Sequence, residues 1–500
     1  MAMDKTVEMS ANDLVAYFQK PASELTKADI VTFVREKGIR MVDFMYPAED
    51  GRVKTLNFML NNLAYLEAIL TYGERVDGSS LFPSFVEAES SDLYVVPRFS
   101  TAFVSPFSEI PTLCLLCLFF DKDGQPFACS PGQTLHRAAE AFTASTGMTY
   151  EAMGELEYYV IAEDDGMFPA VDQRGYHESE PFAKLGEFRK KCMEYIAQTG
   201  GQIKYGHSEV GNFTENGKVY EQNEIEFLPC PVESAADQLV LAKWVIRNLA
   251  YEYGLDVTFA PKITAGKAGS GLHIHMRLMK DGHNCMTSGG ELSAEARRAI
   301  AGMMELAPSI TAFGNKTPVS YFRLVPHQEA PTSVCWGDCN RSVLVRVPLG
   351  WNFKSVEARA KGEHGGCTLP SDSSKQTVEM RSPDASADVY QLMAGLCVAC
   401  RYGLEMDEGK ALGIAADKYV GLGESGSNND KFEQLPDCCV ASAAWLEKHR
   451  GIYEADGVFS PRMLDGIISK LRSLDDAGLR AKAEQDAGLM DELVRASFHC

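Results

Sequence analysis

The sequence predicts an α+β protein built as two units, a small one at the N-terminus and a larger one after it. Short strand-like runs separated by turns occupy the early part of the chain, at 39–47, 54–60, 91–97 and 113–120. A polar turn, DKDGQPF, follows the last of these runs. A helix then begins at Ser130 and Pro131, which suit an N-cap and a first helical position. Beyond it, strands that carry charged residues alternate with helices, which indicates a second and larger unit.

Each segment has a local reason for its expected structure. We expect residues 1–28 to form a short helical extension and a helix to start at Thr26, a plausible cap. Residues 29–128 then form the small α+β unit and residues 129–500 the large one. In the large unit, amphipathic patterns predict helices at 233–254, at 294–310 and over roughly the last 40 residues. The polar stretch GLGESGSNNDK predicts a loop.

Charge and cysteine usage exclude several classes of protein. The formal net charge of −21, with no Lys/Arg-rich block, argues against nucleic acid or an acidic membrane surface as a partner. No window approaches the ~20 apolar residues that span a membrane, and the N-terminus lacks a signal-peptide pattern. The fourteen cysteines lie mostly in apolar stretches, which indicates reduced, buried thiols. We therefore expect a folded cytoplasmic protein.

Two familiar motifs do not fit their usual roles. GLGESG at 421–426 matches a dinucleotide-binding fingerprint, but SNNDK follows it where a helix should begin. The pairs Cys114/Cys117 and Cys397/Cys400 have metal-site spacing, yet leucine-flanked segments favour core packing instead. No Walker A sequence is present, so a site for ATP must be built in another way.

Pairs of charged residues share one face of several predicted strands. Side chains alternate across a strand, so residues i and i+2 lie on the same face roughly 6–7 Å apart. One such strand is commonly the solvated face of a sheet. The pattern recurs four times, however, and it is unusually rich in Glu and His: Glu155 and Glu157, Glu224 and Glu226, His273 and His275, and Glu379 and Arg381. Converging strands of this kind predict an open, concave sheet that binds cations.

So many acids packed together are costly unless cations neutralise them. Hard divalent cations prefer carboxylate oxygens, and Glu with an occasional His suits Mg²⁺ or Mn²⁺ better than zinc. We therefore predict a two-metal site that could bridge nucleotide phosphates. Arg323, Arg341 and Arg346 supply complementary charge. Surface salt bridging is the ordinary interpretation of any one of them, but apolar segments surround Arg323 and Arg346, which favours an anionic ligand.

Taken in order, these segments resemble the glutamine synthetase family, in particular its bacterial type I. The matching pieces are VDGSS, GELEYY, RGY, HSEV, EQNEIEF, GSGLHIHM, SYFRLVPHQEAP, NRSVLVR and VEMRSPD. The resemblance implies an N-terminal β-grasp domain followed by a large catalytic domain with an antiparallel half-barrel sheet flanked by helices. It also implies a homo-oligomer, a dodecamer of two hexameric rings with active sites between subunits.

The resemblance also implies roles for individual residues. One metal would be held by Glu157, Glu209 and Glu224, and the other by Glu155, His273 and Glu379; on sequence grounds Glu209 falls in a loop before an irregular stretch. Arg341, Arg346 and Arg381 would stabilise the phosphoryl group, Arg323 and Gly269 would bind glutamate, and His275 with Arg346 would bind the nucleotide. Ammonium would be bound by Tyr176, Glu209 and Glu329, together with Asp77 reaching in from the neighbouring subunit.

The implied reaction joins ammonia to the γ-carboxylate of L-glutamate through γ-glutamyl phosphate, giving L-glutamine, ADP and phosphate, with ATP and two or more Mg²⁺ or Mn²⁺ ions. Ala268 departs from the family, which usually has an Asn there to hold the substrate amino group, and the loop at 351–375 is longer than usual. Ala268 leaves room for an alternative, a γ-glutamyl-amine or polyamine ligase. A catalytically inactive structural or regulatory homologue is a third hypothesis, although none of the implied metal ligands is missing.

Overall fold

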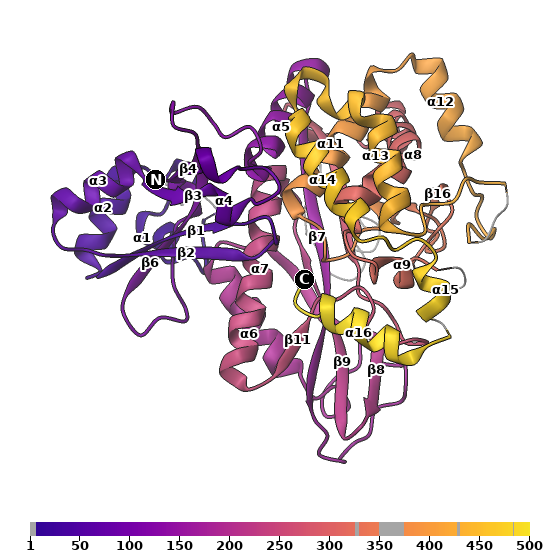
Figure 1. Ribbon diagram of the computed structural model, residues 1–500, viewed down its shortest axis with the longest axis horizontal. Coiled ribbons are helices and arrows are strands. Elements are labelled where there is room, and N and C mark those ends of the chain that lie inside the picture. The colour runs from indigo at the N-terminus through magenta and orange to yellow at the C-terminus, as the bar shows by residue number, and fades with distance from the viewer. Residues whose placement is uncertain (1–6, 326–329, 350–374, 428–430, 484) are drawn as a thin grey trace, which may run out of the picture.

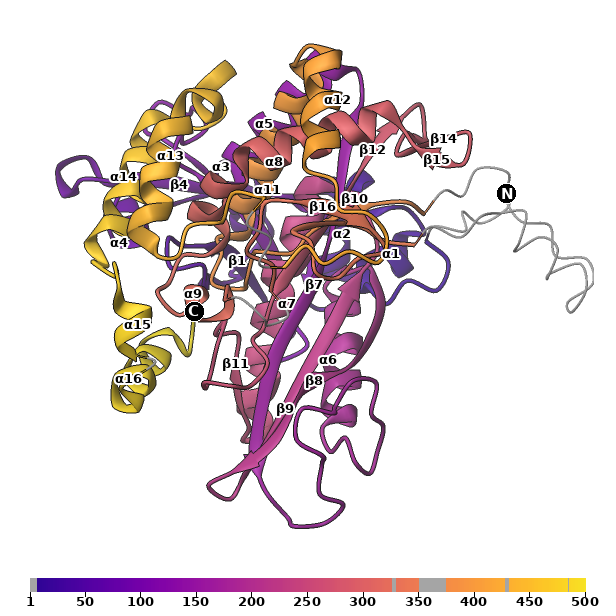
Figure 2. The same ribbon diagram turned by 90° about the vertical axis from the view of Figure 1, so that its right-hand side faces the viewer.

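The structure is a computed structural model, and it describes residues 7–325, 330–349, 375–427, 431–483 and 485–500. In Figure 1 the N-terminal unit lies to one side of a larger unit, whose long strands project away from a group of helices. Figure 2, turned by 90°, shows the long strands β7 (Thr149–Glu163), β8 (Ile203–Glu215) and β9 (Lys218–Phe227) running side by side. Within the described part of the chain, no helix is long and apolar enough to cross a membrane.

The N-terminal unit is a six-stranded sheet with helices beside it. Its strand order is β2-β1-β6-β4-β3, with β5 paired to β6, and β1 runs parallel to β6 while the other pairs are antiparallel. Thr26 caps α2 through a capping box with Asp29, as the sequence predicts. The elements are α1 (Asp13–Phe18), α2 (Lys27–Glu36), β1 (Met41–Pro47), β2 (Val53–Met59), α3 (Leu63–Tyr72), β3 (Glu74–Asp77), α4 (Gly78–Leu81), β4 (Asp92–Pro97), β5 (Phe103–Val104) and β6 (Thr112–Phe120).

The larger unit is organised around a ten-stranded sheet of order β16-β17-β18-β12-β7-β9-β8, which is antiparallel except between β16 and β17. Its main strands are β7 (Thr149–Glu163), β8 (Ile203–Glu215), β9 (Lys218–Phe227), β12 (Leu272–Lys280), β16 (Trp336–Asp338), β17 (Val345–Val347) and β18 (Val378–Met380). Short strands β10 (Cys230–Pro231) and β11 (Asp256–Thr258) pair with β7, and β13 (His283–Asn284) pairs with β12. A separate hairpin joins β14 (Thr287–Ser288) to β15 (Glu291–Leu292).

Helices cover the sheet and extend beyond it. Ser130 occupies the N-cap of the first of them, with Pro131 at the first turn, but its side chain makes no capping hydrogen bond. The helices are α5 (Pro131–Thr146), α6 (Gly186–Gln198), α7 (Val232–Tyr253), α8 (Ala294–Gly314), α9 (Ser320–Arg323), α11 (Val389–Glu405), α12 (Glu408–Asp417), α13 (Cys439–Glu454), α14 (Pro461–Ser473), α15 (Leu479–Ala483) and α16 (Ala487–Ser497). The segment at 421–426 contains no helix or strand, and the thirteen described cysteines are free, as predicted.

Strand β7 separates an apolar face from a charged one. Leu156 and Tyr158 are fully buried in the main core. Gly154 lies on their face, and a Cβ there would lie 2.7 Å from a methyl carbon of Leu239 in α7, so only glycine lets the helix pack this closely. Because side chains alternate along the strand, Glu155 and Glu157 point to the opposite face.

The last two helices pack behind α9. Val319 and Phe322 form a buried cluster with Ala483, Met490 and Val494 of the C-terminal segment. Because α9 carries Arg323, the C-terminal segment supports one wall of the site described next.

Candidate active site

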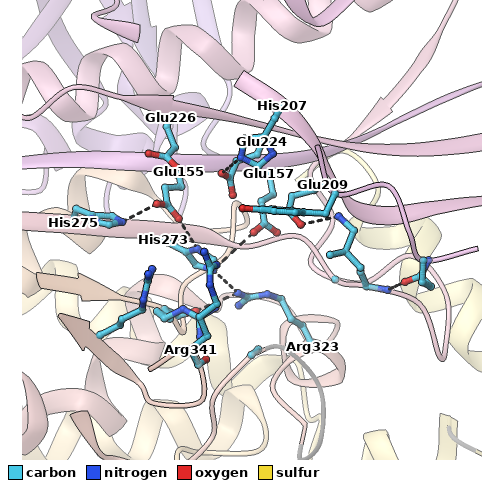
Figure 3. Close-up of a pocket in the computed structure, with 18 of the residues that line it drawn as sticks. Glu155, Glu157, His207, Glu209, Glu224, Glu226, His273, His275, Arg323 and Arg341 are labelled. Atoms are coloured by element: carbon cyan, nitrogen blue, oxygen red, sulfur yellow. Dashed lines mark hydrogen bonds and ion pairs between the residues drawn. The ribbon is translucent and has the colours of Figure 1, made fainter. Parts of the chain in front are cut away.

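A pocket of about 800 Å³ opens on the charged face of the ten-stranded sheet. Side chains from four neighbouring strands converge on it (Figure 3). They are Glu155 and Glu157 from β7, His207 and Glu209 from β8, Glu224 and Glu226 from β9, and His273 and His275 from β12. The predicted concave, acidic sheet surface is therefore present.

Strand register places like charges directly opposite one another. Glu155 lies opposite Glu226, and Glu157 lies opposite Glu224, so four carboxylates occupy the corners of one patch of sheet. Like charges in this position destabilise a sheet. His273 lies opposite Glu155 on the other side of β7. The hydrogen bonds between the strands thus hold mutually repelling carboxylates close together. A bound cation would neutralise them.

Three groups of side chains bring their ligand atoms within 4.8 Å of one another: Glu155, His273 and Glu379; Glu157, Glu224 and His273; and His207, Glu224 and Glu226. The first group is the complete set that the sequence predicts for one metal. His273 Nδ1 lies 2.9 Å from Glu155 and 3.6 Å from Glu379. The donor set is rich in carboxylate oxygens and has one imidazole, which fits Mg²⁺ or Mn²⁺.

The second predicted set is only partly assembled. Glu157 and Glu224 lie together with His273, whereas Glu209 is outside the group although it lines the same pocket. Its Oε2 accepts a hydrogen bond of 2.7 Å from the N–H of Val210. The expectation of a loop here is wrong, because Glu209 lies within strand β8. It sits where the pairing of β8 with β9 is irregular between Ser208 and Asn212, and that bulge turns the side chain toward the pocket rim.

Burial and neighbouring charges divide the carboxylates into two kinds. Burial alone would raise the pKa of Glu155, but His275 and His273 outweigh it and hold that pKa well below its usual range. Burial, reinforced by Glu155 and Glu157, raises the pKa of Glu224 well above its usual range. No Lys or Arg among the described residues pairs with Glu224, and a divalent cation would supply positive charge there.

The four predicted arginines surround the carboxylates. Arg346 Nη1 pairs with Glu379 at 2.9 Å, and its buried Nε has no hydrogen-bond partner among the described residues. Arg381 Nε donates to Glu379 at 3.0 Å, and its Nη1 donates to the carbonyl of Arg341. Arg341 lines the pocket directly. Arg346 lies within β17, whereas Arg341 precedes that strand.

Arg323 is buried and holds the strand-to-helix connections of the pocket wall. Its Nη1 donates to the carbonyls of Ser382, at 2.8 Å, and Pro383, at 3.2 Å, while Nη2 donates to the carbonyl of Arg381 at 3.1 Å and lies 3.3 Å from His273 Nε2. A bidentate grip on a carboxylate therefore requires some of these bonds to be exchanged.

The glycine-rich segment before β12 runs against this arginine. A Cβ at Gly271 would lie 2.5 Å from Arg323 Nη2 and 2.7 Å from His273 Nε2, and one at Gly269 would lie 2.6 Å from the carbonyl oxygen of Pro261. Only glycine permits such contacts. Ala268 lines the pocket beside Gly269, and its carbonyl accepts a 2.9 Å hydrogen bond from the Tyr159 hydroxyl.

The remaining predicted residues lie at different distances from this centre. His275 lines the pocket, with Nε2 2.8 Å from Glu155 and Nδ1 2.9 Å from the Thr377 hydroxyl. Tyr176 lies at the rim, half exposed and stacked on His177. Asp77 is in the N-terminal unit and is not among the residues that line this pocket; Ser80 and Ser79 lower its pKa to about 2. Glu329 and positions 351–374 lie outside the described residues.

Sequence reasoning assigned no role to several pocket residues. His207 Nε2 lies 3.0 Å from Glu224. Lys204 neutralises the fourth carboxylate, Glu226, which also accepts a hydrogen bond from the Tyr205 hydroxyl. The i+2 spacing of Glu224 and Glu226 and the His of HSEV were the available signals, but only strand pairing shows that they face one another.

Fold and site together define an α+β protein with a half-barrel sheet whose concave face can hold divalent cations. Two family models match it, the glutamine synthetase β-grasp domain over residues 38–122 and the glutamine synthetase catalytic domain over residues 128–473. The chain therefore belongs to the glutamine synthetase family, as the sequence motifs predicted, and its fold is the one that they implied. The division at 128/129 remains a proposal.

The chain has moderate sequence identity to several named proteins. It is 30% identical to the glutamine synthetase of Clostridium saccharobutylicum over 436 residues, 85% of this chain and 90% of the relative. It is also 29% identical to a 3-hydroxylaminophenol mutase of Cupriavidus pinatubonensis over 482 residues, 88% and 94% of the two chains. The glutamine synthetase structure of Plasmodium falciparum shares the fold, with a TM-score of 0.75, 18% identity and coverage of 93% and 99%.

Proposed function

We propose that the protein is a glutamine synthetase that joins ammonia to the γ-carboxylate of L-glutamate, using ATP and giving L-glutamine, ADP and phosphate. One observation carries the proposal. Two overlapping carboxylate–histidine groups lie in one pocket with Arg323, Arg341, Arg346 and Arg381 around them. Such a site suits the transfer of a phosphoryl group to a carboxylate, because both reactants are anions.

We further infer which residues hold the metals. Glu155, His273 and Glu379 would hold one cation and Glu157 with Glu224 the other, with Glu209 joining the second from the rim. The donor chemistry fits Mg²⁺ or Mn²⁺, and these ions would neutralise the phosphates of ATP and the developing phosphoryl charge. Register supports the assignment, since Glu157 and Glu224 lie opposite each other and their repulsion needs a counter-charge.

The arginines act on the phosphoryl group in this proposal. ATP transfers its γ-phosphoryl to the glutamate γ-carboxylate, giving ADP and γ-glutamyl phosphate; ammonia then attacks the acyl carbon and expels phosphate. Arg341 and Arg346 would stabilise the moving negative charge, and the Nε of Arg346, which has no hydrogen-bond partner among the described residues, offers a donor for it. Arg381 would hold Glu379 and the Arg341 backbone in place. His275, fixed between Glu155 and Thr377, would border the nucleotide.

Glutamate and ammonium would occupy the end of the pocket opposite the nucleotide. Arg323 and Gly269 would receive the glutamate α-carboxylate, with exchange of the arginine's present carbonyl partners. Tyr176 and Glu209 would line the ammonium position with Glu329. Asp77 is exposed and does not line the pocket of its own chain, which supports a ring-shaped homo-oligomer, a dodecamer by family resemblance, in which it completes the site of a neighbouring subunit.

Phosphate release from ATP, measured with glutamate and each acceptor in turn, tests the proposal. We expect turnover with ammonium, little with methylamine or putrescine, and none in Glu157→Ala. Glu163→Ala, an exposed position on the same strand, is the matched control and should retain activity. Turnover only with amines would sink the glutamine synthetase proposal, and no turnover with any acceptor would favour an inactive homologue.

One observation favours a second candidate, a γ-glutamyl-amine or polyamine ligase. Ala268 lines the pocket with a methyl group, which leaves space and removes a hydrogen-bonding side chain beside the substrate. Replacing it separates the two candidates. Ala268→Asn should tighten glutamate binding in a glutamine synthetase, whereas in an amine ligase it should reduce turnover with the organic amine.

A further inference from the structure

A second cavity, of about 140 Å³, lies where the N-terminal unit meets several parts of the larger unit, and it shares no lining residue with the carboxylate pocket. The β1–β2 turn supplies Glu49 and Asp50, α7 supplies Lys243, the segment before α9 supplies Lys316, and α14 supplies Lys470. One water needs roughly 10–15 Å³ by the same kind of measure. The cavity therefore has room for a small polyatomic ion with several waters.

The three carboxylates on the cavity wall already have partners. Glu49 accepts hydrogen bonds from the backbone and hydroxyl of Ser84, at 2.8 and 2.6 Å, and pairs with Lys470 at 3.1 Å. Asp50 pairs with Lys54 at 2.6 Å. Asp388 caps α11 by accepting from the N–H of Gln391 at 3.0 Å. None of them forms an ion pair with Lys316 or Lys243.

Two of the lysines form no ion pair with any of the described residues. The ammonium of Lys316 makes no hydrogen bond or ion pair within the described part of the chain, although the residue lies largely inside the protein. Burial lowers the pKa of Lys316, and it lowers that of Lys243 to about 8 with help from Arg247. The ammonium of Lys243, which is 5% exposed, donates to the carbonyl of Ala385. The carboxylate of Asp388 acts against this lowering at both lysines, but burial outweighs it. An ammonium group that is buried without an ion-pair partner is costly, so the cavity favours an anion.

We propose that this cavity is a binding site for a small, doubly charged oxyanion of the phosphate class, held by the ammonium groups of Lys243, Lys316 and Lys470. The hydroxyl-bearing residues Thr317 and Ser386 also line it; the Ser386 hydroxyl donates to Asp384 and the Thr317 hydroxyl bonds Ser320, so each would exchange its partner to donate to an anion. A bound dianion would join the N-terminal unit to α7 and α14. It would therefore stabilise the contact between the two units independently of the reaction at the sheet.

Isothermal titration calorimetry with inorganic phosphate, on the full chain without ATP or glutamate, tests the site. The arginine-rich pocket also binds anions, so we expect two classes of phosphate site in the wild type. Arg341→Gln should weaken one class. Lys316→Met should weaken the other about tenfold or more, because it removes a charged hydrogen-bond donor. Lys410→Met, on the exposed surface of α12, is the matched control and should bind like the wild type.

Two further variants keep the test decisive if Lys316→Met folds poorly. Lys316→Arg retains the charge and should retain phosphate binding, and Lys470→Gln, at a half-exposed position, should weaken it by freeing the carboxylate of Glu49 to repel the anion. Acetate, a single charge, should bind this class more weakly than phosphate. The proposal is overturned if every phosphate site disappears in Arg341→Gln, or if Lys316→Met and Lys470→Gln both bind phosphate like the wild type.

Discussion

Replacing Glu224 with Gln separates the stability of the metal-free protein from its affinity for metal. Glu224 lies opposite Glu157 in the register of β7 and β9, and its pKa is raised by burial and by the neighbouring carboxylates. Glutamine has nearly the same shape, and its side-chain amide can still hydrogen-bond His207 Nε2, which lies 3.0 Å from the Glu224 carboxylate. The variant therefore removes charge while it leaves packing in place. We expect Glu224→Gln to stabilise the metal-free protein and to weaken its response to Mg²⁺ or Mn²⁺.

The expected change in the free energy of unfolding follows from the position of Glu224 opposite Glu157. Removing one directly opposed like-charge pair in a sheet should raise the free energy of unfolding by roughly 1 kcal/mol. Because the native pKa of Glu224 lies above the unfolded value of about 4.3, the native state binds more protons, and the wild type loses stability as pH rises from that value to the native pKa. The advantage of the variant should therefore appear above this window and vanish below about pH 4.

Thermal unfolding with EDTA and with Mn²⁺ measures both effects. A metal at a hundredfold excess over its Kd stabilises a protein by about 2.7 kcal/mol. We expect the wild type to show a metal-dependent rise in Tm, and Glu224→Gln to start higher in EDTA and gain less. Glu163→Gln, exposed near the end of β7, should match the wild type in both conditions. A variant less stable than the wild type in EDTA at pH 8 would refute the reasoning.

Three other substitutions test separate parts of the site. Gly271→Ala should lower turnover at least about tenfold, because the new Cβ would displace Arg323 and His273. Its control is Gly413→Ala in α12, where a Cβ meets nothing within 4 Å. This variant should retain activity and raise the free energy of unfolding by about 0.5–1 kcal/mol in chemical denaturation. Arg346→Gln should destabilise the fold by about 1–3 kcal/mol through the loss of a buried pair with Glu379, and an unchanged urea midpoint would contradict this. Val494→Asp should raise KM for glutamate more than KM for ATP, since α16 supports the arginine-bearing helix; equal increases would speak against it.

Alternation along strands made the charged face predictable, because Glu155 and Glu157 must share a face once β7 is extended. Two features of the site could not be predicted from the alternation of side chains along a strand. Glu209 owes its position to a bulge, and a bulge depends on how two strands pair. Arg323 is buried as expected, but backbone carbonyls from residues distant in sequence satisfy it. Helix α3 and strand β3 were not predicted either, because their apolar faces are defined only by packing on the N-terminal sheet.

The sheet register also bears on how such a protein can change its chemistry. The carboxylates and His273 stand on strands whose spacing is fixed by the backbone ladder, whereas Ala268, Tyr176 and Arg341 lie outside the strands, on connecting segments. A substitution in a connecting segment leaves the hydrogen bonds between the strands intact. We therefore expect a change of acceptor or reaction to arise from substitutions in the connections, with the strands retained. Engineering a new acceptor should begin with those connections and leave the strands untouched.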